Sequence, residues 1–222
     1  MDATVPRLDL ARGYSISRVI KGGWQLAGGH GRIDKTQALE DMKRFVEAGI
    51  TTFDCADIYT GVEELIGSFL KENRAAFLSG SLPPVQVHTK YVPDLAELSF
   101  LTKHRIGEVI DRSLRRLGVE RLDLVQFHWW DFAVPGYVEA ALHLEAFRAA
   151  GKIRHIGLTN FDGARLWEIL EAGVAVVSNQ VQYSVLDRRP ERDLAGPAEQ
   201  QGIKLLAYGT AAGGFLSNRW LG

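Results

Sequence analysis

The sequence has little of several features that mark common protein classes. Cys55 is the one cysteine among 222 residues, which excludes an internal disulfide framework and a cysteine-rich metal site. The 26 Lys and Arg are balanced by 27 Asp and Glu, so there is no basic excess for nucleic acid or an anionic membrane surface. No apolar run reaches the length of a signal peptide or a membrane span. We therefore expect a cytoplasmic protein with neither a nucleic-acid nor a membrane partner.

Hydrophobic residues are plentiful, at 46% of the chain, which is enough for a large core. From about residue 19, short apolar runs alternate with amphipathic segments. The runs are RVIKGGW (18–24), TTFDCA (51–56), VQVHTKY (85–91), LDLVQFHW (122–129), IRHIGLTN (153–160), VAVVSNQVQ (174–182) and IKLLAY (203–208). This alternation predicts a parallel sheet covered by helices. No linker or low-complexity tract interrupts it, so we predict a single domain over residues 1–222.

The amphipathic segments carry recognisable helix boundaries. Asp34 and Gln37 have the spacing of a capping box, and Gly49 supplies the left-handed residue that ends a helix. Similar apolar stripes end before Gly118 and Gly173. These boundaries predict a helix after nearly every strand.

The ends of the predicted strands distinguish a closed barrel from an open sheet. Nearly every strand ends in a polar or aromatic residue: Trp24, Asp54, Lys90, His128, Asn160, Gln180 and Tyr208. Along an open sheet these side chains would lie too far apart to cooperate, whereas a ring would turn them all toward one mouth. We therefore predict a (β/α)8 barrel of the TIM type, of which this chain contains about seven βα units.

Other familiar motifs are missing. The glycines between Gly22 and Gly31 match neither a dinucleotide fingerprint nor a phosphate loop, and we expect a flexible loop there. The histidines, His30 among them, show no metal-ligand spacing, and there is no nucleophile elbow for a serine. Cys55 follows Asp54 on a strand and should point to the opposite face, as a small buried hydrophobe.

Three of the strand ends stand out chemically. Asp54 ends a strand built for burial, with Tyr59 in the loop above it, and Lys90 ends the next strand. A buried lysine needs a partner, and Asp54 is the obvious one, so a purely structural ion pair is an equally good interpretation of these two residues. His128 lies in phase with Gln126 and therefore points inward with it. Three neighbouring strands thus bring an aspartate, a tyrosine, a lysine and a histidine to the same end of the sheet. This combination favours a site with specific chemistry.

Taken in order, these segments resemble the aldo/keto reductases, which are NAD(P)H-dependent oxidoreductases on a (β/α)8 barrel. The matching segments are FDCADIYTGVEELIG, HTK, LDLVQFHWWD, IRHIGLTNF, SNQVQYS and LLAYGTAAGG. Cys55 and Thr159 depart from the commoner residues of the family, and Thr60-Gly61 adds a residue after the tyrosine. The chain also stops at Gly222, after the seventh strand, whereas the family continues through an eighth.

The resemblance implies reduction of an aldehyde or ketone to an alcohol by hydride from a nicotinamide cofactor. Tyr59 would be the general acid, and Lys90 would lower its pKa. Asp54 would hold the Lys90 ammonium. His128, in its neutral form, would donate a hydrogen bond to the carbonyl oxygen.

The resemblance also implies where the cofactor and the substrate bind. The carboxamide would contact Thr159, Asn160 and Gln180, and the ring would stack on Tyr208. The family mostly uses NADPH, and NADH is possible. Trp24, Trp129 and Trp130 would wall the pocket of a small-molecule carbonyl substrate, which three tryptophans predict to be apolar or aromatic.

Other functions remain open at this point. The barrel could be a non-catalytic nicotinamide-binding subunit of a larger assembly, or a piece of a longer reductase. The oligomeric state is open as well. Seven strands would leave the first and seventh as exposed edges, and barrel phosphate sites usually come from the loops after strands seven and eight, of which this chain has at most the first. We therefore expect the 222-residue chain alone to bind NAD(P)H weakly and to unfold or associate more readily than a full-length relative.

Overall fold

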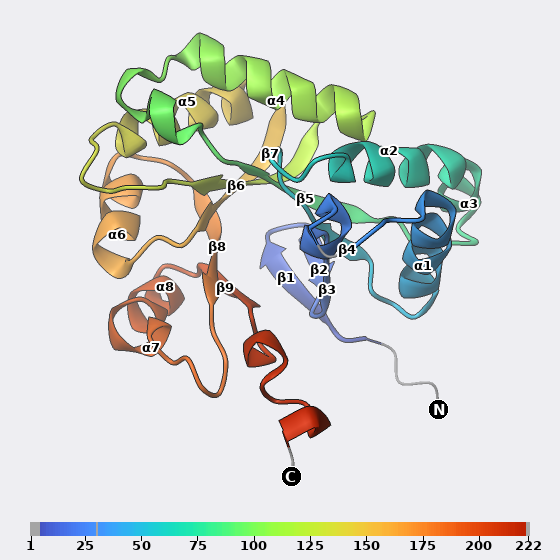
Figure 1. Ribbon diagram of the computed structural model, residues 1–222. Helices are drawn as coiled ribbons and strands as arrows, with labels where there is room; N and C mark the ends of the chain where they lie inside the picture. Colours follow the sequence, from blue (N-terminus) through green and yellow to red (C-terminus); the bar gives the residue numbers. More distant parts are fainter. Residues whose placement is uncertain (1–4, 30, 221–222) are drawn as a thin grey trace.

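The computed structural model describes residues 5–29 and 31–220 and shows a curled parallel sheet with helices on its outer side (Figure 1). Its seven strands lie side by side in chain order. They are β3 (Ile20–Gly22), β4 (Thr52–Asp54), β5 (Gln86–Tyr91), β6 (Leu122–His128), β7 (Ile153–Thr159), β8 (Val176–Gln182) and β9 (Lys204–Tyr208). Every neighbouring pair is parallel. The barrel-type sheet of about seven units is therefore confirmed, and within the described residues β3 and β9 are its edges.

Helices connect the successive strands from β3 to β9 along the outer face of the sheet (Figure 1). They are α1 (Lys35–Glu47), α2 (Val62–Glu72), α3 (Arg74–Ser79), α4 (Lys103–Leu117), α5 (Tyr137–Ala149), α6 (Gly163–Glu171), α7 (Pro190–Asp193) and α8 (Ala195–Gln200). Short 3₁₀ segments are η1 (Trp24–Ala27), η2 (Leu95–Phe100), η3 (Ala212–Gly214) and η4 (Asn218–Trp220). Where a flexible loop was expected after β3, part of the segment is thus the ordered turn η1.

Helix boundaries follow the local chemistry, with two differences from expectation. The Asp34 side chain accepts the Gln37 N–H at 3.2 Å, but the Gln37 side chain turns to Asp41. Only half of the capping box therefore forms. Helix α2 was not predicted, because it begins after Gly61, at φ 77°, with no side-chain cap. It is held by its apolar stripe instead of by a polar residue at its start.

An antiparallel hairpin precedes the barrel-type sheet, in a region where no regular structure was predicted. It consists of β1 (Arg7–Ala11) and β2 (Tyr14–Ser17) and lies within the curve of the sheet (Figure 1). Its apolar side chains are buried in a small core with inward residues of two sheet strands. This core contains Leu10, Tyr14, Ile16, Leu124 and Leu206. The hairpin thus covers the interior from the end at which the strands begin.

The larger core lies between the sheet and the helices. Outward side chains such as Phe53 and Phe127 pack there against helix residues such as Phe69 and Ile106. Cys55 is fully buried in the same core, as expected from its place after Asp54. With one end covered by the hairpin, the inward side chains at the carboxyl ends of the strands form the accessible end of the interior.

Candidate active site

A buried ion pair lies at the carboxyl ends of β4 and β5. The Lys90 Nζ donates to Asp54 Oδ2 at 2.6 Å and to the Cys55 carbonyl at 3.0 Å. The side chains of Lys90 and Asp54 are 5% and 11% exposed. Burial alone would lower the pKa of Lys90, but the carboxylate of Asp54 and the phenol of Tyr59 hold it above its ordinary value. Lys90 is therefore a fixed cation inside the protein.

Two amide side chains complete the surroundings of Asp54. The Gln126 Nε2 donates to Asp54 Oδ1 at 2.7 Å, and the Gln180 Nε2 donates to the same oxygen at 2.9 Å. The two carboxylate oxygens are thus divided between the ammonium and the amides. The sequence showed that Gln126 points inward but not that it binds Asp54, because the contact spans 72 positions in the chain.

Tyr59 lies in the loop between β4 and α2, against Lys90. The Lys90 Nζ is 5.2 Å from the centre of the Tyr59 ring. Burial raises the pKa of Tyr59, and the nearby Lys90 cation acts in the opposite direction without cancelling that effect. Lys90 thus acts on the Tyr59 pKa in the expected direction, but burial outweighs it and the net shift is upward. The phenol stays protonated at neutral pH.

His128 ends β6 with its ring held by the next strand. Its Nδ1 is 3.3 Å from the carbonyl oxygen of Thr159. A carbonyl can only accept, so this contact requires a proton on Nδ1. Burial lowers the pKa of His128, and in the neutral ring the proton on Nδ1 leaves Nε2 as an acceptor. This tautomer differs from the expectation that neutral His128 donates to a substrate.

Two of the three predicted tryptophans lie beside these groups. The ring of Trp24 packs edge-on to Tyr59 with centroids 5.3 Å apart, and that of Trp130 packs edge-on to His128 at 4.7 Å. Trp24 is 54% exposed and Trp130 is 49% exposed. They present wide apolar surfaces next to the polar group.

Trp129 does not share this position. It is 2% exposed, packs against Phe127 and Tyr137, and donates its indole N–H to the carbonyl of Asp131. Side chains of an extended segment alternate between its two faces, so the residue after His128 points outward into the core beneath the helices. The expectation that Trp129 walls the same pocket as Trp24 and Trp130 is therefore corrected.

The four residues predicted to hold a cofactor lie at or near the carboxyl ends of β7, β8 and β9. Tyr208 is 40% exposed and donates its hydroxyl to Asn160 Oδ1 at 3.0 Å. Asn160 has a left-handed backbone, at φ 61°, which is uncommon outside glycine. The Thr159 Oγ1 is buried and has no hydrogen-bond partner among the residues that the structure describes, whereas the Gln180 amide nitrogen is already bound to Asp54. Thr159, Asn160 and Tyr208 thus gather at one side of the opening.

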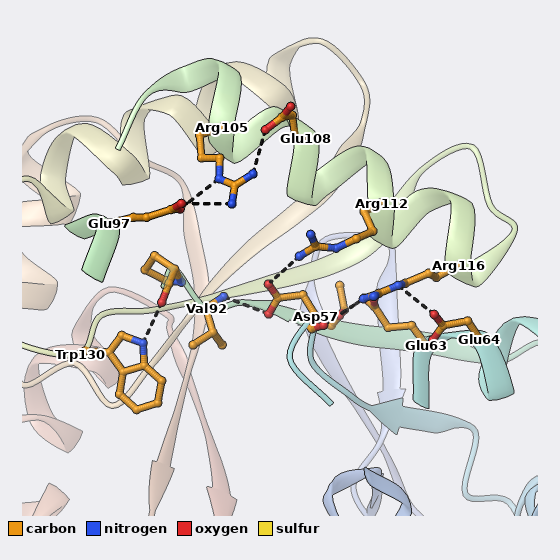
Figure 2. Close-up of polar contacts among 12 residues, drawn as sticks. Asp57, Glu63, Glu64, Val92, Glu97, Arg105, Glu108, Arg112, Arg116 and Trp130 are labelled. Atoms are coloured by element: carbon orange, nitrogen blue, oxygen red, sulfur yellow. Dashed lines mark hydrogen bonds and ion pairs between the residues drawn. The ribbon is translucent and has the colours of Figure 1, made fainter. Parts of the chain in front are cut away.

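A second polar cluster, not predicted from the sequence, lies on the outer side of β5. Figure 2 shows Arg112 and Arg116 of α4 reaching the loop that carries Asp57. Asp57 is 6% exposed; its Oδ1 accepts the Val92 N–H at 3.2 Å, and its Oδ2 is 3.8 Å from the Arg112 guanidinium. Burial raises the pKa of Asp57 to about 7. The pattern around Tyr59 could not reveal this cluster, because its arginines come from a helix more than 50 positions away.

A cavity of about 490 Å³ adjoins this cluster. Its walls include Asp57, Ile58, Arg112 and Trp130. Trp130 thus has one edge against His128 and also borders this cavity.

Two further findings concern residues 5–29 and 31–220. Among them, no group of three or more His, Cys, Asp or Glu could hold a metal ion; His30 lies outside the described residues. None of the helices in this part of the chain is long and apolar enough to cross a membrane.

Comparison with known proteins gives a consistent result. Residues 18–221 match the model of the aldo/keto reductase family. The chain is 30% identical to the aldo-keto reductase YhdN of Bacillus subtilis, covering 93% of this chain and 62% of that protein. It is 28% identical to the NADH-specific methylglyoxal reductase of Escherichia coli, covering 91% of this chain and 66% of that protein.

A solved structure gives the same picture. The glycerol dehydrogenase AKR11B4 of Gluconobacter oxydans superposes with a TM-score of 0.76 at 28% identity, over 97% of this chain and 65% of that one. The chain thus spans a little under two thirds of the length of each of these relatives. It belongs to the aldo/keto reductase family.

Proposed function

We propose that the protein reduces a small aldehyde or ketone to an alcohol with a nicotinamide cofactor, and that Tyr59 is the general acid. The observation that carries the proposal is the buried Asp54–Lys90 pair, with the Lys90 ammonium 5.2 Å from the centre of the Tyr59 ring. A structural ion pair alone needs no partly exposed phenol beside it. The reductase names of the relatives support the same reaction class.

The residues around Asn160 fit a nicotinamide carboxamide. The orphaned Thr159 Oγ1 and the side chain of Asn160 offer a donor and an acceptor side by side. Tyr208 presents a half-exposed ring beside them on which a flat heterocycle can stack. We assign these three residues to the cofactor, with Gln180 contributing through its carboxamide oxygen. NADPH is our first choice and NADH the second.

The nicotinamide that these residues would hold would supply, in its reduced form, the hydride for the carbonyl carbon. The carbonyl oxygen gains negative charge as its double bond breaks, and it needs a proton at that moment. The Tyr59 hydroxyl gives that proton and becomes a phenolate. Lys90 stabilises the phenolate, and Asp54 keeps the ammonium in place.

His128 has a different role from the one that the resemblance implies. In the neutral ring, Nδ1–H is committed to the Thr159 carbonyl, so Nε2 can only accept. We infer that Nε2 accepts a hydrogen bond from the hydroxyl of the product alcohol, after Tyr59 has given up its proton. A protonated His128 would donate to the carbonyl oxygen, but burial lowers its pKa and opposes that form.

The tryptophans indicate the kind of substrate. Trp24 packs against Tyr59 and Trp130 packs against His128, and both tryptophans are about half exposed. Flat apolar walls favour an apolar or aromatic carbonyl compound.

The direct test replaces Tyr59 with phenylalanine and measures steady-state reduction of an aromatic aldehyde with NADPH and with NADH. We expect kcat/KM to fall at least about a hundredfold, the usual share of general acid catalysis. Cofactor affinity, followed by tryptophan fluorescence, should not change. Tyr137→Phe on α5 is the matched control and should retain activity.

Two outcomes would contradict the proposal. Full activity of Tyr59→Phe would exclude Tyr59 as the acid. Tight cofactor binding without turnover on a broad panel of carbonyl compounds would favour a nicotinamide-binding subunit instead.

A further inference from the structure

The segment from Cys55 to Gly61 carries Tyr59 from β4 to α2. Its first half runs along β5, where the Cys55 N–H donates to the His88 carbonyl at 2.7 Å and the Asp57 N–H donates to the Lys90 carbonyl at 3.2 Å. The segment then turns away, through a hydrogen bond from the Tyr59 N–H to the Ala56 carbonyl. Asp57 is therefore the last residue at which β5 holds the backbone before Tyr59.

Arg116 binds this point from the outside. Its Nη1 donates to the Asp57 carbonyl at 3.0 Å and to Glu63 Oε2 at 3.2 Å, and its Nε lies 2.9 Å from Glu64 Oε1 (Figure 2). One guanidinium thus joins the loop before Tyr59 to the first turn of the helix after it.

Glu63 extends this connection to the strand that carries Lys90. Its side chain is fully buried, and its Oε1 accepts the Thr89 hydroxyl at 2.7 Å. Thr89 immediately precedes Lys90 and points to the opposite face of β5. The Arg116–Glu63 pair therefore touches both the backbone that carries the phenol and the strand that carries the ammonium.

The starting point of the Arg116 side chain is itself fixed. A Cβ atom on Gly67 of α2 would lie 2.3 Å from the Arg116 carbonyl oxygen, so the two helices meet there at backbone distance. Only glycine permits this approach. The Arg116 backbone is thus held against α2, which leaves its side chain a defined path to Asp57.

We propose that Arg116, together with Glu63, is a positioning residue that sets the placement of the Tyr59 phenol relative to the Lys90 ammonium. The inference rests on the proposed function of Tyr59. Arg116 acts through the Asp57 carbonyl and the start of α2, without touching the substrate. Displacement of an acid by about 1 Å can reduce a rate by about a hundredfold, so a contact of this kind affects kcat more than substrate binding.

The test compares Arg116→Met with Arg115→Met, the exposed neighbour on the same helix. For Arg116→Met we expect kcat to fall about tenfold or more with KM unchanged. Because the phenol loses part of its interaction with Lys90, its pKa should rise. The phenol pKa is the second readout, and it is measured from the tyrosinate absorbance during an alkaline titration. The curve of the double variant Tyr59→Phe/Arg116→Met is subtracted from that of Arg116→Met, which leaves the contribution of Tyr59. Arg115→Met should match the wild type in both.

Two further variants separate positioning from folding. Arg116→Met leaves Glu63 buried without its cation, so the double variant Glu63→Gln/Arg116→Met removes that charge and should restore the unfolding midpoint but not kcat. Arg116→Lys should recover part of kcat, since its single ammonium can bind Glu63 or the Asp57 carbonyl.

The two proposals fail in distinguishable ways. Wild-type kcat and an unchanged phenol pKa in Arg116→Met would overturn the positioning role while Tyr59→Phe remained inactive. Recovery of kcat together with stability in the double variant would also overturn it, because the effect would then be structural. Tyr59→Phe with full activity would overturn the proposed function, whereas a shifted phenol pKa in Arg116→Met would still support positioning.

Discussion

His88 and Lys90 are two residues apart on β5 and point into the same interior, yet one is neutral and the other charged. Lys90 meets the carboxylate of Asp54 at 2.6 Å. The Nε2 of His88 meets the Tyr14 hydroxyl at 3.1 Å, and burial lowers the pKa of His88 to about 4. The interior thus accepts a charge only where a carboxylate stands against it.

The hairpin accounts for the difference between the two ends of the interior. At the end where the strands begin, Leu10, Tyr14 and Ile16 are at most 3% exposed and exclude water. At the other end, Trp24 and Trp130 remain about half exposed beside Tyr59 and His128. We infer that the base of the sheet provides stability and the open end provides chemistry, as in other barrels of this type.

The largest effect is expected from Lys90→Met. Loss of the cation should reduce kcat at least about a hundredfold, and Asp54 left buried without its partner should lower the free energy of unfolding by about 3–5 kcal/mol. Urea unfolding and steady-state kinetics measure the two effects separately. The double variant Asp54→Asn/Lys90→Met should regain stability without activity. A single variant as stable as the wild type would show that Asp54 does not depend on the pair.

A second expectation concerns acid. The pKa of His88 and that of His155 are both lowered by burial to about 4. Unfolded histidine titrates near 6.5, so between about pH 6.5 and 4 the unfolded state binds more protons and stability falls as the pH falls. For His88 alone the loss is about 3 kcal/mol, since each pKa unit corresponds to about 1.4 kcal/mol.

Asp57 acts in the opposite direction over a similar range. Its pKa is raised to about 7 in the folded protein, so its contribution to stability falls as the pH rises from about 4 to 7. The urea midpoint should therefore depend less on pH between 7 and 4 in His88→Gln than in the wild type, and more on pH in Asp57→Asn. Parallel curves for His88→Gln and the wild type would mean that the pKa of His88 is not lowered in the folded protein.

The comparison also explains what could be predicted from the sequence. Strand-end polar residues and the period of two were enough to bring Asp54, Lys90 and His128 to one end of the sheet. The same period would have placed Trp129 on the outer face, had it been applied one residue further. The segment LDLARGYSIS shows the alternation of a hairpin with Gly13 at its turn, at φ 70°, but it is too short to stand out from a loop.

The remaining contacts are tertiary and carry no local pattern. Gln126 and Gln180 reach Asp54 from other strands, and Arg116 reaches the Asp57 carbonyl from α4. Which carbonyl a long side chain binds depends on helix packing, here on the close approach at Gly67. The tautomer of His128 likewise depends on the Thr159 carbonyl of the neighbouring strand.

The smallest and sharpest expectation compares one phenol oxygen at each end of the sheet. Tyr14→Phe removes the hydroxyl that pairs with His88 Nε2 and keeps the ring, over which the Arg154 guanidinium lies at 4.8 Å. The His88 Nδ1 already lacks a hydrogen-bond partner among the described residues, and the substitution leaves Nε2 unpaired as well, which costs about 1–3 kcal/mol. We expect the urea midpoint to fall and kcat to stay unchanged.

Tyr59→Phe makes the same chemical change at the open end and should give the reverse result. Tyr59 is only partly buried, with its ring against the half-exposed Trp24, so we expect stability to change little while the proton donor is lost. The pair of variants therefore separates the two ends with one atom each. A clear fall in kcat in Tyr14→Phe, alongside the fall in the urea midpoint, would mean that packing at the base of the sheet affects the Asp54–Lys90 pair. The division between a stabilising end and a chemical end would then be wrong.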